Sequence, residues 1–318
     1  MKKQVLDFEK PIAELESKLE DLIRHTPGQD IDLDPEVKAM RSKIAETRAR
    51  IYSELTAWQR VQIARHTERP FALDYVRDAF RDFVELKGDR LFGEDASMPG
   101  GFATIDGIRC VVIGQQKGRD VKENLLRNFG SPHPEGYRKA LRLMRLAEKF
   151  SLPVVALIDT PGAYPGVGAE ERHIAEAIAV NIRDMMLLRT QIVAVVIGEG
   201  GSGGALGIGV ADRVLMLENA YYSVISPEGC AAILWKHRKH APEAAEALKL
   251  NASELLKLGI IDDIIPEPPG GAHCDMSAAA AALGEAVSSA LQELCKVPME
   301  ELLQKRYDKF RRMGRFAE

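Results

Sequence analysis

Glycine-rich turns are the segments of this sequence best suited to chemistry. Residues 197–207 read Ile-Gly-Glu-Gly-Gly-Ser-Gly-Gly-Ala-Leu-Gly and follow an apolar run typical of a buried strand. Successive glycines at the start of a helix leave backbone N–H groups unpaired, and the helix dipole adds to their partial positive charge. Such donors stabilise a developing oxyanion without any side chain. We therefore expect an oxyanion site at Gly203 and Gly204, where the missing Cβ would let a ring approach the backbone.

A second turn of this kind, Asp159-Thr-Pro-Gly-Ala-Tyr-Pro-Gly, ends the preceding apolar run. Pro161 has no N–H, so Gly162 and Ala163 are the available donors. In a parallel sheet both turns fall at the carboxyl ends of strands, where sites collect. The sequence therefore predicts that the two turns act together. The alternative for either turn is tight packing of a helix against a strand.

The same glycine-rich loop also matches two other motifs. Gly198, Gly200 and Gly203 form G-x-G-x-x-G with Glu218 downstream, as in dinucleotide-binding folds, although the strand comes late in the chain. The overlapping G-x-S-x-G would make Ser202 the nucleophile of a serine hydrolase. The residues available to complete its triad lie in later, mostly charged or Gly/Pro-rich segments: Asp212, Asp262, His237, His240 and His273.

The segments around these turns predict a body built on an α/β pattern. Strands and helices alternate, and the strands are apolar throughout, which is typical of a mostly parallel sheet covered on both faces. Asp106-Gly107 is a strong hairpin signal between the first two strands. The predicted elements are strands Gly101–Ile105 and Ile108–Gly114, a helix from Pro134, strand Pro153–Ile158, a helix to about Leu188, and strands Ile192–Ile197 and Val214–Leu217.

The two ends of the chain are predicted to be helical. Residues 1–87 show helical spacing of apolar residues, broken at His25-Thr-Pro-Gly and restarted at Asp34-Pro35. A third helix is predicted through Tyr75, Ala79, Phe80 and Phe83. We expect 1–87 to be an oligomerisation or partner-docking appendage, or a lid on its own core, and 88–318 to be the body. The predicted C-terminal helices are Pro242–Leu250, Ser253–Leu258, Ser277–Leu294 and Met299–Phe310.

Composition excludes several classes of protein. The 318 residues contain 43 Lys and Arg against 47 Asp and Glu, and a net charge of −4 argues against a nucleic-acid binder. The four cysteines include no C-x-x-C pair, so we expect no zinc or other metal site. The N-terminus has no apolar segment typical of a signal peptide, and no apolar run is long enough to span a bilayer. We expect a cytoplasmic protein.

Several motifs stand in fixed order along the chain: Gly88-Asp-Arg, Gly114-Gln-Gln-Lys-Gly-Arg, Asn128-Phe-Gly, 134–144, 159–168, 198–209, Leu217-Glu-Asn and Ser223-Val-Ile-Ser-Pro-Glu-Gly-Cys. Together they resemble one known family, the carboxyl transferase alpha subunits of bacterial-type acetyl-coenzyme A carboxylase. The resemblance covers nearly the whole chain and is most specific between about 88 and 236. Two positions depart from it, since His173 and Lys87 stand where the family usually has Gly and His.

The resemblance implies a crotonase-type (ClpP/crotonase-like) fold and a complex of two alpha and two beta subunits. It implies transfer of a carboxyl group from carboxybiotin, presented by a biotin carboxyl carrier protein, to acetyl-CoA, giving malonyl-CoA for fatty-acid synthesis. No cofactor is expected to be bound covalently to this chain. ATP is expected to be used only by the separate biotin carboxylase component, and zinc to belong to the beta subunit.

The resemblance fits the chemistry expected of the two turns. Charge develops on the ureido oxygen of biotin and on the thioester oxygen, and N–H donors suffice for both. We expect Lys117 and Arg119 to line the entrance for CoA phosphates or carboxylated biotin, with Tyr164, Gly201 and Ser202 also at the substrate. Three alternatives remain open: a stand-alone crotonase-type acyl-CoA hydratase or isomerase using Glu170 or Glu171, the Ser202 hydrolase, and a non-catalytic scaffold.

Overall fold

The computed structural model describes residues 4–24 and 34–314. At its centre lies one sheet in the order β1-β2-β3-β4-β5-β6-β8, with β7 paired to the end of β5. The first three strands are antiparallel, and the pairs from β3 to β8 are parallel, so the predicted mostly parallel sheet is confirmed. The strands are β1 Arg81–Glu85, β2 Gly100–Ile105, β3 Ile108–Gly114, β4 Val154–Thr160, β5 Ile192–Gly201, β6 Arg213–Leu217, β7 Tyr221–Ser223 and β8 Asp263–Ile265.

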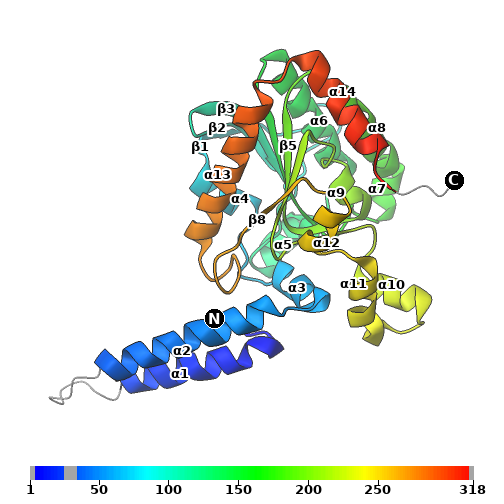
Figure 1. Cartoon of the computed structure of the whole chain (residues 1–318). Coiled ribbons are helices and arrows are strands. Elements are labelled where there is room, and N and C mark those ends of the chain that lie inside the picture. Colours follow the sequence, from blue (N-terminus) through cyan, green and yellow to red (C-terminus); the bar gives the residue numbers. More distant parts are fainter. Residues whose placement is uncertain (1–3, 25–33, 315–318) are drawn as a thin grey trace.

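Helices cover both faces of this sheet (Figure 1). The helices α6, α8 and α14 form one layer, while α4 and α13 pack together on the other face. No helix of the described residues is both long and apolar enough to cross a membrane. The helices are α1 Lys10–Arg24, α2 Asp34–Ser53, α3 Ala57–Ala64, α4 Ala72–Ala79, α5 Val121–Leu126, α6 Pro134–Lys149, α7 Val167–Glu171, α8 Ile174–Leu187, α9 Ser202–Leu206, α10 Pro227–Leu234, α11 Ala241–Leu248, α12 Ala252–Lys257, α13 Met276–Leu294 and α14 Met299–Arg311.

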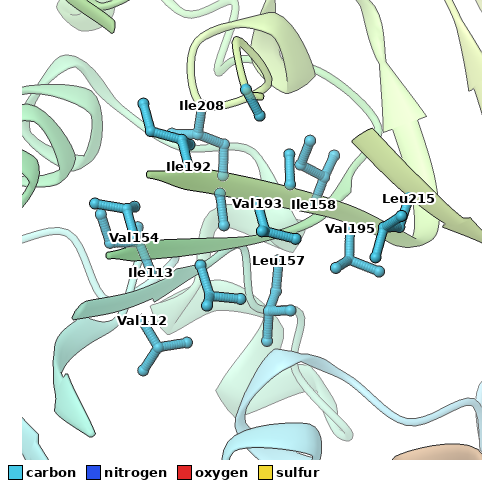
Figure 2. Packing of buried hydrophobic residues seen from close by; sticks show 14 of the residues in the cluster. Val112, Ile113, Val154, Leu157, Ile158, Ile192, Val193, Val195, Ile208 and Leu215 are labelled. Carbon is cyan, nitrogen blue, oxygen red and sulfur yellow. The ribbon is translucent and has the colours of Figure 1, made fainter. Parts of the chain in front are cut away.

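The core is built on β4 and β5, the two central strands that lead into the predicted site. Every residue of both strands is buried, because helices cover the two faces of the sheet. Figure 2 shows Val154 and Leu157 of β4 beside Ile192, Val193 and Val195 of β5. Each such side chain contributes roughly 1.5–3 kcal/mol on burial, so the strand ends before the two turns are held rigidly.

The predicted hairpin is confirmed in position and in turn chemistry. β2 and β3 pair from Ile105 opposite Ile108, which leaves a two-residue connection. Asp106 and Gly107 have φ of +46° and +77°, the left-handed backbone that a type I′ turn requires at both positions.

The predicted third helix is wrong in its last part. The helix α4 ends at Ala79, Phe80 is extended, and Arg81–Glu85 forms the edge strand β1. Pairing with β2, from Arg81 opposite Thr104, satisfies backbone groups that a longer helix would have satisfied internally. As a result α1 and α2 are the described part of 1–87 that projects from the body, and α4 and β1 belong to the body (Figure 1). The predicted break at residues 25–28 lies outside the described residues.

Two further differences concern the segments around the site. β5 continues through the glycines to Gly201, beyond the predicted end at Ile197, because β7 pairs with its last three residues. The predicted single helix before β5 is divided into α7 and α8 at His173, whose φ is +64°. This left-handed backbone favours glycine, and histidine is among the residues that adopt it more readily than most. It accounts for the glycine usual at this position in the family that the sequence resembles.

Candidate active site

Two turns lie side by side at the carboxyl edge of the sheet. β4 ends at Thr160 and β5 at Gly201, and parallel pairing places Thr160 opposite Gly200. The turn at 162–163 therefore meets the first turn of α9 at 202–204. These are the turns that the sequence predicted to act together.

The two turns pack backbone against backbone. A Cβ on Gly201 would collide with the carbonyl of Pro161, and one on Gly204 would lie 2.5 Å from the Ala163 nitrogen and 2.6 Å from the Gly162 carbonyl carbon. Glycine is therefore required at 201 and 204 by the contact between the turns. This corrects the expectation that the missing Cβ of Gly204 opens its backbone to a ring.

Three backbone N–H groups at this contact are unpaired. Gly203 and Gly204 lie in the first turn of α9, which no side chain caps, and Ala163 lies directly against Gly204. Among the described residues no acceptor lies within hydrogen-bond distance of these three N–H groups. Gly162 differs, because its N–H donates to Thr160 Oγ1 over 3.1 Å. Of the four predicted donors, Ala163, Gly203 and Gly204 are therefore the ones whose N–H has no acceptor in the described part of the chain.

Of the glycines in the first turn of α9, Gly203 is the one whose Cβ position is open. A Cβ there would have only the side chain of Ile178 within 4 Å among the described residues, at 3.9 Å. The space at Gly162 is also open, but its φ of +151° already accounts for glycine. Neither packing nor backbone conformation requires glycine at 203. The face of Gly203 is therefore where a ligand can approach the N-terminus of α9.

Two side chains that sequence reasoning missed hold the turns in place. The carbonyl of Gly204 accepts hydrogen bonds from Gln115 Nε2 at 2.8 Å and from the Tyr137 hydroxyl at 3.0 Å. Gln115 Oε1 accepts from the N–H of Asp159 at 3.1 Å, so one amide connects both strand ends. The available signal was that Gln115 directly follows the apolar strand that ends at Gly114.

A buried ionic cluster fixes the end of β5 beneath the turns. Glu199 accepts from Arg65 Nε at 2.6 Å, from the Tyr221 hydroxyl at 2.6 Å and from Lys117 Nζ at 2.8 Å. Lys117 also lies 2.6 Å from Asp159 on β4. Burial opposes ionisation of Glu199, but the charges of Lys117 and Arg65 outweigh it and lower the pKa of this carboxyl to about 2.

The two predicted substrate-binding cations are engaged within the chain. The Lys117 side chain is 14% exposed; burial opposes its charge, yet Asp159 and Glu199 raise its pKa. Arg119 donates to the carbonyls of Thr67 and Arg69, both at 2.9 Å, and also pairs with a carboxylate of α4. These contacts favour an anchoring role for both cations. Contact of either one with substrate stays a prediction.

Ser202 lacks the partners of a hydrolase nucleophile. Its φ of +52° and its exposure resemble a nucleophile elbow, but none of the hydrogen bonds of the described histidines reaches it. Tyr164, on the turn after β4, stacks on His133 with ring centroids 4.2 Å apart. Glu170 and Glu171, which a hydratase would use, are both exposed on α7 and make no hydrogen bond to the two turns within the described part of the chain.

The dinucleotide motif is not a phosphate-binding turn in this structure. Gly198 and Gly200 lie inside β5, and Gly200 is paired with Tyr222. A Cβ on Gly198 would lie 2.5 Å from Asp159 Oδ1, so packing accounts for this glycine. In residues 4–24 and 34–314 no three His, Cys, Asp or Glu side chains gather as metal ligands.

Comparison with known proteins gives one consistent result. A family model described as "Acetyl co-enzyme A carboxylase carboxyltransferase-like" matches residues 5–314. The chain is 55% identical over 313 residues to the acetyl-coenzyme A carboxylase carboxyl transferase subunit alpha of Geobacter metallireducens, covering 98% of each chain. It is also 55% identical to the protein of that name from Thermus thermophilus, covering 98% of this chain and 99% of the relative. Among solved structures, transcarboxylase 12S matches 71% of this chain and 41% of its own with a TM-score of 0.57 at 20% identity, which confirms the predicted crotonase-type fold.

Proposed function

The chain belongs to the acetyl-coenzyme A carboxylase carboxyltransferase family, and from that membership we propose how its two turns serve carboxyl transfer. It is a carboxyltransferase of the alpha-subunit type, and its reaction is carboxyl transfer to acetyl-CoA in fatty-acid biosynthesis, as the sequence predicted. The name of the relatives implies a partner beta subunit. The residues that act, the donor of the carboxyl group and the composition of the complex belong to the proposal.

The observation that supports the proposal is the set of unpaired N–H groups at Ala163, Gly203 and Gly204. Carboxyl transfer breaks the N–C bond of carboxybiotin and leaves negative charge on the ureido oxygen. The N–H groups stabilise that oxyanion, and each donor contributes typically ~2.7–4 kcal/mol to the transition state. The carboxyl group leaves as CO2, the released biotin nitrogen takes a proton from the acetyl methyl group, and the resulting enolate carbon forms the new bond to the carbon of that CO2.

This scheme needs no general base from the two turns. Ser202 is exposed, and the Thr160 hydroxyl is hydrogen-bonded within the chain. We assign the biotin side of the reaction to this chain and the thioester side to the beta subunit, in a complex of two alpha and two beta subunits. Biotin arrives on its carrier protein, ATP is used by a separate biotin carboxylase component, and the reaction takes place in the cytoplasm.

Reconstitution tests the proposed division of labour. The purified chain alone should show essentially no decarboxylation of malonyl-CoA in the presence of biotin, because it holds one half of the site. Addition of the beta subunit in equal amount should restore turnover. Full activity of the isolated chain would overturn the two-subunit assignment.

A further inference from the structure

The tip of α10 and the residues that follow it form a surface that the reaction scheme does not use. Residues 233–239, here called the α10 tip, are exposed at every position. Ile233 and Leu234 are 61% and 65% exposed, and Trp235 is 41% exposed. Lys236, His237, Arg238 and Lys239 follow directly. The surface therefore joins an apolar patch to a basic run.

The basic residues of the α10 tip are not neutralised by the chain. Among the described residues no carboxylate lies within ion-pair distance of Lys236, Arg238 or Lys239. The acidic residue nearest in the sequence, Glu243, is 3.3 Å from His240 instead. In a chain with a net charge of −4, an unpaired basic run is a local feature that attracts an acidic surface.

The start of α10 lies next to the candidate active site. β7 pairs with the end of β5 so that Ser223 lies opposite Gly201, and Ser226 caps α10 three residues later. Near the start of α10, Glu228 pairs with Arg65, which also holds Glu199. The eight residues of α10 extend about 12 Å, so the tip lies about that far from the first residue of the helix. Figure 1 shows α10 and α11 projecting from the body.

We propose that the α10 tip is the docking surface for the protein that carries biotin to this site. The proposal rests on the proposed function. The carrier must bind and leave in every turnover, and electrostatic attraction supports fast, reversible association. A permanent interface, in contrast, is depleted in lysine at its core. Trp235 is the residue type that most often anchors such a contact.

The partner that fits is a carrier domain with an acidic surface around its biotinylated lysine. The basic run steers that surface, and the apolar patch at 233–235 provides the short-range contact. The arm of the biotinyl-lysine then reaches from the docked carrier to the open face of Gly203.

A charge-reversal variant tests the proposal in the complete alpha–beta complex. Lys236, Arg238 and Lys239 are changed together to Glu, and carboxyl transfer from malonyl-CoA is measured with two acceptors, free biocytin and the biotinylated carrier protein. The KM for the carrier should rise by about tenfold or more at low salt, while kcat and KM for biocytin stay unchanged. The wild-type KM for the carrier should rise with salt concentration, and this dependence should flatten in the variant.

A matched control carries the same charge change elsewhere. Arg81, Arg109 and Lys296 are exposed and lack carboxylate partners among the described residues, and Arg81 and Arg109 lie on β1 and β3, away from the site. Their triple change to Glu should leave the KM for the carrier unaltered. An equal rise in both variants would mean that net charge, not this surface, sets the affinity.

Three results are distinguishable. An unchanged KM for the carrier in the Lys236/Arg238/Lys239 variant would overturn the docking proposal. Loss of the beta subunit from that variant on gel filtration would also overturn it, because the surface would then hold beta. Failure of the wild-type complex to carboxylate free biocytin would instead refute the proposed function.

Discussion

A valine at Gly203 tests the oxyanion assignment most selectively. The Cβ would have only Ile178 as a neighbour, at 3.9 Å, so the side chain fits without moving the two turns and projects into the face proposed for biotin. Valine has a higher helix propensity than glycine, so the substitution carries no propensity penalty in α9. Valine keeps its backbone N–H, so the loss comes from a side chain that holds the ureido oxygen away from this donor; a donor out of reach costs about 2.7–4 kcal/mol, or 10²–10³-fold in kcat.

Gly204→Val is a poorer test of the same assignment. Its Cβ would lie 2.5 Å from the Ala163 nitrogen, so that variant would disturb both turns together. Gly284→Ala in α13 is the control for Gly203→Val, because its Cβ would meet Ala79 at an ordinary 3.5 Å and lies away from the turns. Turnover is measured as carboxyl transfer from malonyl-CoA to biocytin, and melting temperature and co-elution with beta report assembly. Near-normal kcat in an assembled Gly203→Val complex would refute the assignment.

Three further variants probe the surroundings of the turns. Ser202→Ala should lower kcat far less than the ~10²-fold loss of a donor, and a fluorophosphonate should not label the wild-type serine; covalent labelling would revive the hydrolase. Thr160→Val removes the hydroxyl that donates to the Gly130 carbonyl at 2.7 Å and accepts from the Gly162 N–H. We therefore expect a lower kcat and a loss of about 1–3 kcal/mol in the free energy of unfolding. An unchanged kcat and an unchanged free energy of unfolding would show that this hydroxyl does not position the turn. The carboxyls of Glu199 and Glu267 are buried, but Lys117 and Arg65 lower the pKa of the first to about 2, and Arg69 lowers that of the second to about 2. Because these values lie below the pKa of the unfolded chain, the two carboxylates stabilise the fold fully above about pH 5, and this stabilisation is lost as the pH falls toward 2. Urea titrations at several pH values should show the free energy of unfolding decreasing over this range, and Glu267→Gln should make that decrease smaller. A Glu267→Gln curve parallel to that of the wild type would contradict the assignment.

The sequence predicted the strands and the location of the site because both depend on local pattern. The run Val154–Ile158 is apolar throughout, and only a strand covered on both faces uses such a run. Asp106-Gly107 encodes its own turn through backbone conformation. The two glycine-rich turns follow such strands, so their neighbourhood follows from parallel pairing.

What the sequence could not predict depends on contacts distant in the chain. β1 is a strand because β2 is available to pair with it, and nothing in 81–85 signals that partner. Gly201 and Gly204 have the same residue type as Gly203, but the turn after β4 closes on the first two and leaves the third open. Lys117 is an ordinary cation in the sequence. Its two carboxylate partners come from β4 and β5, 42 and 82 residues further along the chain.

The most direct measurement follows a labelled carboxyl group. Malonyl-CoA labelled in its free carboxyl is incubated with biocytin and with this chain, with the beta subunit, or with both. The proposed function predicts label in biocytin and release of acetyl-CoA in equal amount only when both chains are present, and loss of that transfer in Gly203→Val. Label transferred by this chain alone, or by the assembled Gly203→Val complex at the wild-type rate, would contradict it.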